Sequence, residues 1–268
     1  MSTLDSGNPR ESAPEKALPF VAPCRELTLG APLRWVALGW QDIKRAPAQS
    51  LAYGSLMVLV SYLLSVLAYE LGSYILVLSL LSGFVFVGPV LAIGMYDISC
   101  QLARGRVPSF GHCLLTSKRN LGNEMVFAIV LLIVFLVWAR AASTLHIFFP
   151  MESDAQWTDF LVFLGVGSAV GGIFADIVFG ASAFALPMIM DRKVDVITAI
   201  VTSVNAVLCN QGAMVIWASI MVLFVAVGFA TAFLGLAVTL PLIGHATWHA
   251  YREAIDGSAW PPQDDETT

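Results

Sequence analysis

The sequence predicts an all-α integral membrane protein with six transmembrane helices, arranged as three hairpins that are each preceded by a cytoplasmic interfacial amphipathic helix. Composition gives the first indication, because 57% of the 268 residues are hydrophobic and only 12% are charged, whereas a typical soluble domain carries roughly twice that share of charge. The second indication is a series of uncharged stretches of membrane-spanning length. The third is the placement of lysine and arginine, which gather in alternate loops.

Long stretches with little or no charge provide the predicted spans, and they cover residues 51–69, 72–96, 125–139, 160–190 and 212–244. A helix of roughly 20 residues crosses the hydrocarbon core of a bilayer. The last stretch is too long for one crossing, and we divide it at "GFATAFLG" (228–235), where two glycines bracket a tight turn. This division brings the predicted number of crossings to six.

Basic residues predict the orientation of these helices. All of the 14 Lys and Arg residues except Arg140 lie before the first span, after the last span, or in the loops that follow the second and fourth spans. The intervening turns, near Glu70 and at "MESDAQWTD" (151–159), contain acids but no Lys or Arg. The positive-inside rule therefore places both termini and the two basic loops in the cytoplasm. Such an arrangement requires an even number of crossings.

Three units of similar pattern divide a predicted membrane domain of residues 31–255, at about 33–107, 108–193 and 194–255. Each unit begins with a mixed apolar and polar stretch of helical period, as an interfacial helix would. Each also carries a proline shortly before its polar cytoplasmic end. The flanking segments, 1–30 and 256–268, are polar and contain proline, so we expect disordered cytoplasmic tails there.

The segment "PLIGHATWHAYREA" (241–254) sets His245 and His249 four residues apart, on one face of a helix. When the three units are aligned by their prolines, Asp191 falls opposite His245 and Asp97 opposite His249. The sequence thus suggests a polar cluster at the cytoplasmic face. Three interpretations remain open: the histidines complement the helix dipole, they form a structural cluster with the carboxylates, or they bind a metal or haem. We assign no metal and no cofactor.

Two charged residues fall within predicted spans, Arg140 in the third and Asp176 in the fourth. Charges in hydrocarbon are costly and usually mark a partner or a pathway. Counted from the cytoplasmic helix ends at 1.5 Å per residue, the two lie at depths of about 24 Å and about 21 Å. We predict an intramembrane ion pair between them. Snorkelling of Arg140 to the outer surface and a substrate or proton pathway are the alternatives.

Small residues recur along the fourth span, at Gly165, Ser168, Gly172 and Ala175. This spacing favours close packing of transmembrane helices. A hinge or a thinned helix beside a cavity, as in a transporter, is the second interpretation.

The four cysteines all lie on the predicted cytoplasmic side, and no two of them form a C-x-x-C pair. We therefore expect free thiols in a reducing compartment. The residues are Cys24, Cys100, Cys113 and Cys209.

The segments "ALPMIMDRKVDVITAI" (185–200) and "LGLAVTLPLIGHATWHAYRE" (234–253) resemble an uncharacterised bacterial family of integral membrane proteins, classed as a domain of unknown function. Some members carry a cytochrome c oxidase subunit I label. The resemblance covers about residues 30–255 and implies a six-helix protein of a bacterial inner membrane. It brings no established activity. A haem–copper oxidase core needs histidines at several depths, whereas this chain has four histidines in all.

The sequence contains no nucleophile elbow, P-loop, dinucleotide fingerprint or HExxH motif, so we expect no enzymatic activity. It favours a membrane protein that acts by helix packing or by association with a membrane complex. The expected partners are the lipid bilayer and another membrane protein or a second copy, with no nucleic acid. A small-solute transporter or channel is the first alternative. A respiratory redox or metal-handling accessory protein is the second, and it depends on the histidine pair alone.

Overall fold

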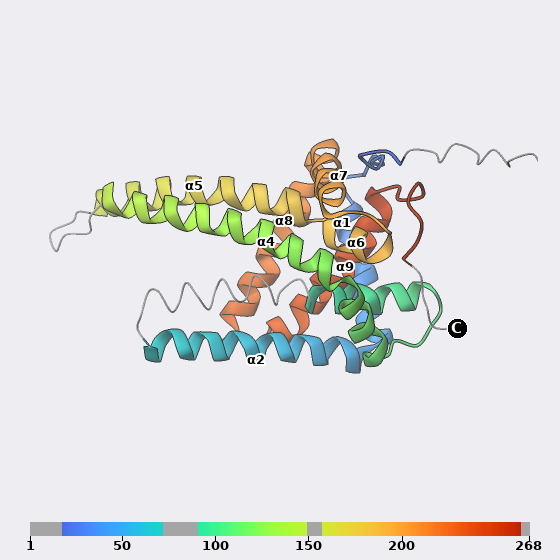
Figure 1. The fold of residues 1–268 in the computed structure, drawn as a ribbon. Coiled ribbons are helices and arrows are strands. Elements are labelled where there is room, and N and C mark those ends of the chain that lie inside the picture. Colours follow the sequence, from blue (N-terminus) through green and yellow to red (C-terminus); the bar gives the residue numbers. More distant parts are fainter. Residues whose placement is uncertain (1–17, 72–90, 149–156, 264–268) are drawn as a thin grey trace, which may run out of the picture.

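The computed structural model describes residues 18–71, 91–148 and 157–263, and within these ranges all of its regular elements are helices (Figure 1). The predicted all-α fold class is confirmed. The helices are α1 (Ala31–Arg45), α2 (Pro47–Leu71), a helix over 91–103, α4 (Phe110–Phe148), α5 (Trp157–Ser182), α6 (Ala185–Asp191), α7 (Val196–Cys209), α8 (Gln211–Ala230) and α9 (Leu236–Ala254).

Membrane-spanning character is found in four segments of the described chain, which lie at Pro47–Leu67, Leu121–Thr144, Leu161–Asp191 and Gln211–Ala230. Each is long enough and apolar enough to cross a bilayer. The predicted span at 72–96 falls largely on residues outside the described ranges. The chain is therefore a multi-pass membrane protein with at least these four candidate spans.

Breaks between the helices follow from local chemistry. Helix α1 ends at Arg45 and α2 begins at Pro47, where the missing N–H of proline permits a helix start but not a continuation. The stretch 108–122, which opens the second unit, was expected to form a separate interfacial helix, but from Phe110 onward it is the first part of the 39-residue helix α4. That prediction was wrong because no proline lies between Pro108 and Pro150 to interrupt the helix.

The division predicted at 228–235 is confirmed as a helix break. Helix α8 ends at Ala230, α9 begins at Leu236, and the turn between them places Ala232 and Phe233 at φ values of 50° and 68°. Gly228 permits the tight return, because a Cβ there would overlap the side chain of Leu236.

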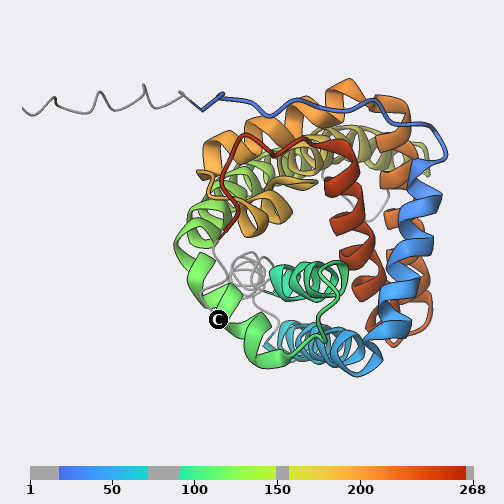
Figure 2. The same cartoon turned by 90° about the vertical axis from the view of Figure 1, so that its right-hand side faces the viewer.

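Residues buried within the chain gather at one end of the molecule, where α1, α6, α7, the helix over 91–103 and the second half of α9 meet. Trp35 of α1 and Trp217 of α8 pack edge to face there, with ring centroids 5.7 Å apart. Helices α2, α4 and α5 project away from this end (Figure 1). Figure 2 shows α1 and α9 side by side. We call this the core end.

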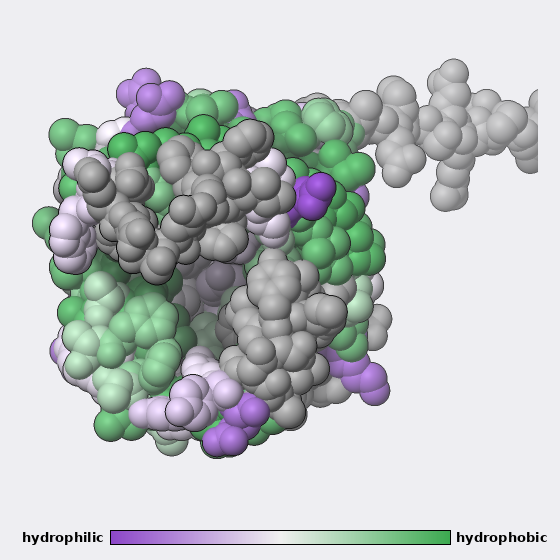
Figure 3. Space-filling model, turned by 90° about the vertical axis from the view of Figure 1, so that its left-hand side faces the viewer, coloured by the Kyte–Doolittle hydropathy of each residue, from purple (hydrophilic) through white to green (hydrophobic). Residues whose placement is uncertain are grey.

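The projecting helices expose apolar side chains, as lipid-facing segments do. Seen from the tips of the hairpins, the described surface is mostly hydrophobic, and a hollow opens between the helices (Figure 3). The arrangement matches a protein whose folded core lies at one membrane face while its hairpins enter the bilayer.

The expected disorder of residues 1–30 is wrong for 18–30, which form an ordered strap along α7. The side-chain amide of Asn210, the residue after α7, binds this strap through both its oxygen and its nitrogen. Its Oδ1 accepts from the backbone N–H of Leu27 at 2.8 Å, and its Nδ2 donates to the carbonyl of Arg25 at 3.0 Å. Residues 1–17 lie outside the described part.

The expected tail at 256–268 also differs from the structure over its first residues, 256–263. Trp260 is 3% exposed. The backbone N–H of Lys193 donates to the carbonyl of Pro261 at 2.9 Å, which ties this segment to the chain after α6. Burial of one large aromatic side chain outweighs the polar composition that suggested disorder.

Two of the four cysteines are paired. The structure joins Cys24 of the strap to Cys209 at the end of α7 as a disulfide, so the expectation of free thiols is wrong for both. It is confirmed for Cys100 and Cys113, which are free and buried. The sequence could not indicate the pair, because 185 residues separate its members.

Candidate functional site

His245 lies at the centre of a buried polar network at the core end. Its side chain is fully buried, and both ring nitrogens have hydroxyl partners. Nε2 lies 2.9 Å from Ser50 Oγ on α2, and Nδ1 lies 2.7 Å from Ser99 Oγ on the helix over 91–103. Three separate helices therefore meet at one imidazole ring.

Asp42 of α1 completes this network and determines the direction of its hydrogen bonds. Ser99 donates its only hydroxyl proton to Asp42 Oδ2 at 2.8 Å, so Nδ1 of His245 must donate to Ser99. Burial lowers the pKa of His245 to about 4. The ring is therefore neutral at neutral pH and carries one N–H. The Ser50 hydroxyl lies 2.9 Å from Nε2 and 2.8 Å from the Ala46 carbonyl, so its single proton can serve only one of these two acceptors.

His249 joins the same network through Asp42 and not through His245. Its Nε2 lies 2.8 Å from Asp42 Oδ2, and Asp42 is 3% exposed. Sequence reasoning missed Asp42. A signal was present, because Asp42 shares the buried face of α1 with the apolar residues Trp35 and Gly39, and a carboxylate on such a face requires a buried partner.

Asp97 lies in a different group of side chains. Its Oδ2 accepts from Gln101 Nε2 at 2.7 Å and lies 2.9 Å from His112 Nδ1. Cys113 lies beside this group, 3.6 Å from Gln101 Nε2. Asp97 thus pairs with a histidine, but with His112 and not with either histidine of α9.

Asp191 lies in a third group, at the C-terminal end of α6. Its Oδ2 accepts from the Tyr251 hydroxyl at 2.9 Å and from Arg192 Nε at 3.0 Å. Arg252 Nη1 lies 3.7 Å from the same oxygen. Burial, together with the charge of Asp191, raises the pKa of Tyr251 well above its usual value, so this hydroxyl remains a donor.

The structure therefore connects only two of the four residues predicted to form one polar cluster. His245 and His249 share a network, whereas Asp97 and Asp191 have other partners. Alignment of the three units by their prolines suggested a common cluster, but Asp97 and Asp191 lie in two other groups of side chains. No group of three or more His, Cys, Asp or Glu side chains within 18–71, 91–148 and 157–263 is arranged to hold a metal ion.

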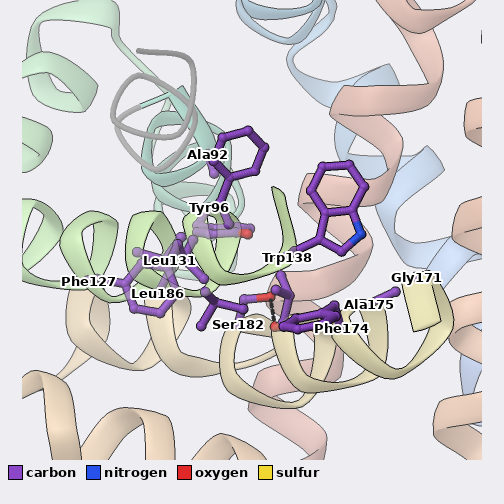
Figure 4. A pocket seen from close by; sticks show the side chains of 13 residues that line it. Ala92, Tyr96, Phe127, Leu131, Trp138, Gly171, Phe174, Ala175, Ser182 and Leu186 are labelled. Carbon is purple, nitrogen blue, oxygen red and sulfur yellow. Dashed lines mark hydrogen bonds between the residues drawn. The ribbon is translucent and has the colours of Figure 1, made fainter. Parts of the chain in front are cut away.

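An apolar cavity of about 620 Å³ lies between α4, α5 and the helix over 91–103 (Figure 4). Aromatic side chains from all three helices border it, including Tyr96, Trp138 and Phe174. Small residues of α5, Gly171 and Ala175, form part of its wall. A cavity of this size and character suits an apolar molecule or chain segment.

Glu124 of α4 lies close to this cavity and was also missed by the sequence analysis. It is 1% exposed, and neither carboxylate oxygen has a hydrogen-bond partner in the described part of the chain. It precedes Phe127, which lines the cavity, by one helical turn. A buried carboxyl group without a partner is costly and usually serves a purpose beyond packing.

Arg140 and Asp176 lie on adjacent helices, but the structure does not bring their side chains together. Helices α4 and α5 pack against each other. Both side chains are nevertheless exposed, and among the ion pairs between described residues none joins them. The pair predicted within one chain is not formed here.

The small residues of α5 also differ from the first expectation. Gly165, Ser168, Gly172 and Ala175 are all exposed. A Cβ built on Gly165 or Gly172 would meet no atom within 4 Å. Within the described part of the chain, Gly165 and Gly172 therefore pack closely against no other helix, while Ala175 also borders the cavity. We call this set the small-residue face of α5.

Comparison with known proteins gives one family match. Residues 76–191 match DUF2189, which is described as a predicted integral membrane protein. No curated protein and no solved structure matches the chain. The matched region is shorter than the 30–255 implied by the sequence resemblance, and it ends before the histidine pair. It does contain the α4–α5 hairpin, the cavity and Glu124. Over residues 76–191, then, the chain matches DUF2189, a family of predicted integral membrane proteins of unknown function.

Proposed function

We propose that this protein is a non-enzymatic, multi-pass protein of a bacterial inner membrane whose α4–α5 hairpin associates with a second copy of the chain. The observation that carries the proposal is the small-residue face of α5, which is exposed on a membrane-spanning helix. Small residues let two transmembrane helices approach until their backbones are in van der Waals contact. A face of this kind that stays exposed among the described residues is suited to a helix from another chain.

The exposed charges on the same hairpin support this proposal. Asp176 lies in the middle of the candidate span Leu161–Asp191 and is exposed. An aspartate facing lipid at the centre of a helix costs about 2.5 to 3.5 kcal/mol on insertion scales, and its short side chain cannot reach the membrane surface. A protein that retains this aspartate is therefore stabilised when another protein surface covers the carboxylate.

A second copy supplies the complementary charge. Arg140 lies on the neighbouring antiparallel helix α4 and is also exposed. In a twofold dimer each contact occurs twice. Arg140 of each copy would then face Asp176 of the other. The intramembrane ion pair predicted from the sequence becomes, in this proposal, a pair between copies.

Replacement of Gly172 by leucine is expected to weaken self-association by about tenfold, because the added side chain separates the helices that the small-residue face brings together. Energy transfer between donor-labelled and acceptor-labelled copies, co-expressed in one membrane, measures the association. Gly122→Leu is the matched control, since Gly122 lies in the candidate span of α4 with nothing within 4 Å of its Cβ. Equal energy transfer in wild type and Gly172→Leu would remove the small-residue face from the interface.

The proposal includes six crossings with both termini in the cytoplasm. Gln49, near the start of α2, donates from Nε2 to the carbonyl of Pro108, just before α4, at 2.9 Å. This contact supports a return crossing between these residues. At the other end of the chain, Cys24 and Ile255 form an antiparallel bridge. Their proximity favours an even number of crossings between them.

Helices α8 and α9 would supply the fifth and sixth crossings, as the third hairpin. The Tyr62 hydroxyl donates to the carbonyl of Ala232 in the turn between them, so this turn lies beside the spanning part of α2. The three hairpins, preceded by α1, by the first turns of α4 and by α7, would correspond to the three units expected from the sequence.

Reporter fusions test this topology. Fusions of alkaline phosphatase after Glu70, Ala155 and Leu234 are expected to be active, because each site would lie on the outer side, whereas a fusion after Asp264 is expected to be inactive. Fusions of green fluorescent protein at the same sites provide the reciprocal control, since fluorescence requires a cytoplasmic location. An active phosphatase after Asp264 would contradict an even number of crossings.

A small-solute transporter is the second candidate, and Glu124 is the observation that favours it. A buried carboxyl group that has no hydrogen-bond partner among the described residues, and lies one turn from an apolar cavity of about 620 Å³, is the kind of group that binds a proton or a cation in transporters. The self-association proposal does not require Glu124, so the two functions are compatible.

A further inference from the structure

We propose that the core end carries a phosphate-binding site formed by the guanidinium groups of Arg25, Arg192 and Arg252. These arginines come from three separate parts of the chain, namely the strap 18–30, the residue after α6 and the last turn of α9. No other feature described above depends on this site, and it is independent of the proposed self-association.

The three arginines line one cavity of about 180 Å³. A cavity of this volume holds several water molecules, so a phosphate group fits. Gly257 forms part of the wall, and a Cβ there would lie 3.3 Å from the Tyr251 hydroxyl and 3.5 Å from Arg192 Nε. The absence of a side chain at this position keeps the cavity open beside Arg192.

Each arginine is held in place by contacts that leave part of its guanidinium available. Arg25 Nη1 donates to the carbonyl of Arg252 at 3.3 Å, and its Nη2 lies 3.6 Å from Asp256. Arg192 donates from Nη1 to the carbonyl of Trp260 at 3.1 Å and from Nε to Asp191. A guanidinium has five N–H donors, and these contacts engage two on each.

Arg252 is the most available of the three. Its side chain is 55% exposed, with Nη1 3.7 Å from Asp191. Its guanidinium carbon lies 5.9 Å from the centre of the Trp248 ring, a cation–π contact that orients the group. Planar guanidinium groups bind phosphate oxygens in a bidentate manner, which makes arginine the preferred residue for phosphate recognition.

The charge balance of the cavity favours an anion. Three arginines face two carboxylates, those of Asp191 and Asp256. Asp191 is 4% exposed and receives hydrogen bonds from Tyr251 and Arg192, so it is fully engaged. Asp256 is half-buried, its Oδ1 accepts from the backbone N–H of Ser258 at 3.1 Å, and its contact with Arg25 is long, at 3.6 Å. A phosphate group can therefore displace Asp256 from Arg25 at little cost.

The phosphate can come from two sources that share this chemistry. One is a free phosphate anion or phosphate monoester. The other is the headgroup of an anionic phospholipid, because clusters of basic residues at the cytoplasmic membrane surface attract such lipids. The same three arginines would bind either ligand.

The experiment has one arm for each source and uses the full chain purified in detergent and phosphate-free buffer. In the first arm, inorganic phosphate is titrated and followed by calorimetry. In the second, native mass spectrometry measures retention of phosphatidylglycerol against phosphatidylcholine. The variants are Arg25→Gln and Arg252→Gln. Lys44→Gln is the matched control, because Lys44 is an exposed cation on α1 outside the cavity.

Saturable binding in either arm, weakened about tenfold or more by each arginine variant and unchanged by Lys44→Gln, is the expected result. Asp256→Asn is expected to tighten binding, and this gain cannot arise from misfolding. Phosphate binding without lipid retention would identify a soluble anion, and lipid retention would identify a headgroup. The proposal is overturned if neither ligand binds saturably, or if Lys44→Gln weakens binding as much as the arginine variants do.

Discussion

Replacement of Gly54 by valine is expected to reduce the free energy of unfolding by about 3 kcal/mol. Gly54 lies on α2 at the point where α9 crosses it. A Cβ at this position would overlap the carbonyl group of Ala237 and would lie 2.8 Å from the ring of Pro241. Because the first obstacle is backbone, no change of side-chain rotamer relieves the clash. The two helices must separate.

Thermal unfolding in detergent measures this loss, and Gly111→Val provides the control. Gly111 lies on α4 with nothing within 4 Å of its Cβ, so its replacement reports the effect of valine on the helix alone. The Gly54 variant is expected to unfold at a clearly lower temperature than the control. Equal unfolding temperatures would show that α2 and α9 do not approach as closely as the structure places them.

The same crossing brings the buried network together. Ser50 lies one turn before Gly54 on α2, and its hydroxyl reaches Nε2 of His245 on α9. Separation of the two helices would therefore break this hydrogen bond and expose His245 to water. The close packing of α2 and α9 at Gly54 therefore also holds together the buried polar network around His245.

The membrane character and much of the helix pattern could be predicted from the sequence, because both depend on local properties. Apolar stretches marked the spans at α2, α4, α5 and α8. The glycines at 228 and 235 marked the turn before α9. The continuous helix α4 was not foreseen, since a change from polar to apolar composition does not end a helix unless a proline or a cap accompanies it.

The candidate site was harder to predict, because its members come from distant parts of the chain. His245 and His249 were recognised by their spacing. Their partner Asp42 precedes them by about two hundred residues, at a sequence separation of 207 from His249. Its position on the apolar face of α1 was the only local signal. Glu124 gave no such signal, because its lack of a partner is a property of the packed structure.

The defined structure of residues 18–30 and 256–263 was not predicted from the sequence, for a related reason. Composition alone predicts disorder for polar segments rich in proline. The strap is held instead by specific partners, the amide of Asn210 and the disulfide to Cys209. Arg25 of the strap and residues 256–258 also line the arginine cavity, so segments expected to be tails contribute to the proposed phosphate site.

Exchange of charges between two copies tests the central claim, that Arg140 of one copy pairs with Asp176 of another. A copy with Arg140→Asp carries only acidic residues at the two positions, and a copy with Asp176→Arg carries only basic ones. Each variant alone is expected to lose self-association by about tenfold or more, since like charges would then face each other in hydrocarbon. Neither variant can form the pair within its own chain.

Co-expression of the two variants is the decisive measurement, because a mixed dimer restores both ion pairs across the interface while leaving like charges within each chain. Energy transfer between a donor-labelled Arg140→Asp copy and an acceptor-labelled Asp176→Arg copy is therefore expected to return to near the wild-type level. Immunoblots of the membrane fraction confirm equal insertion of both. If both variants insert and the mixed pair associates no better than either variant alone, the pairing of α4–α5 hairpins through these charges is contradicted.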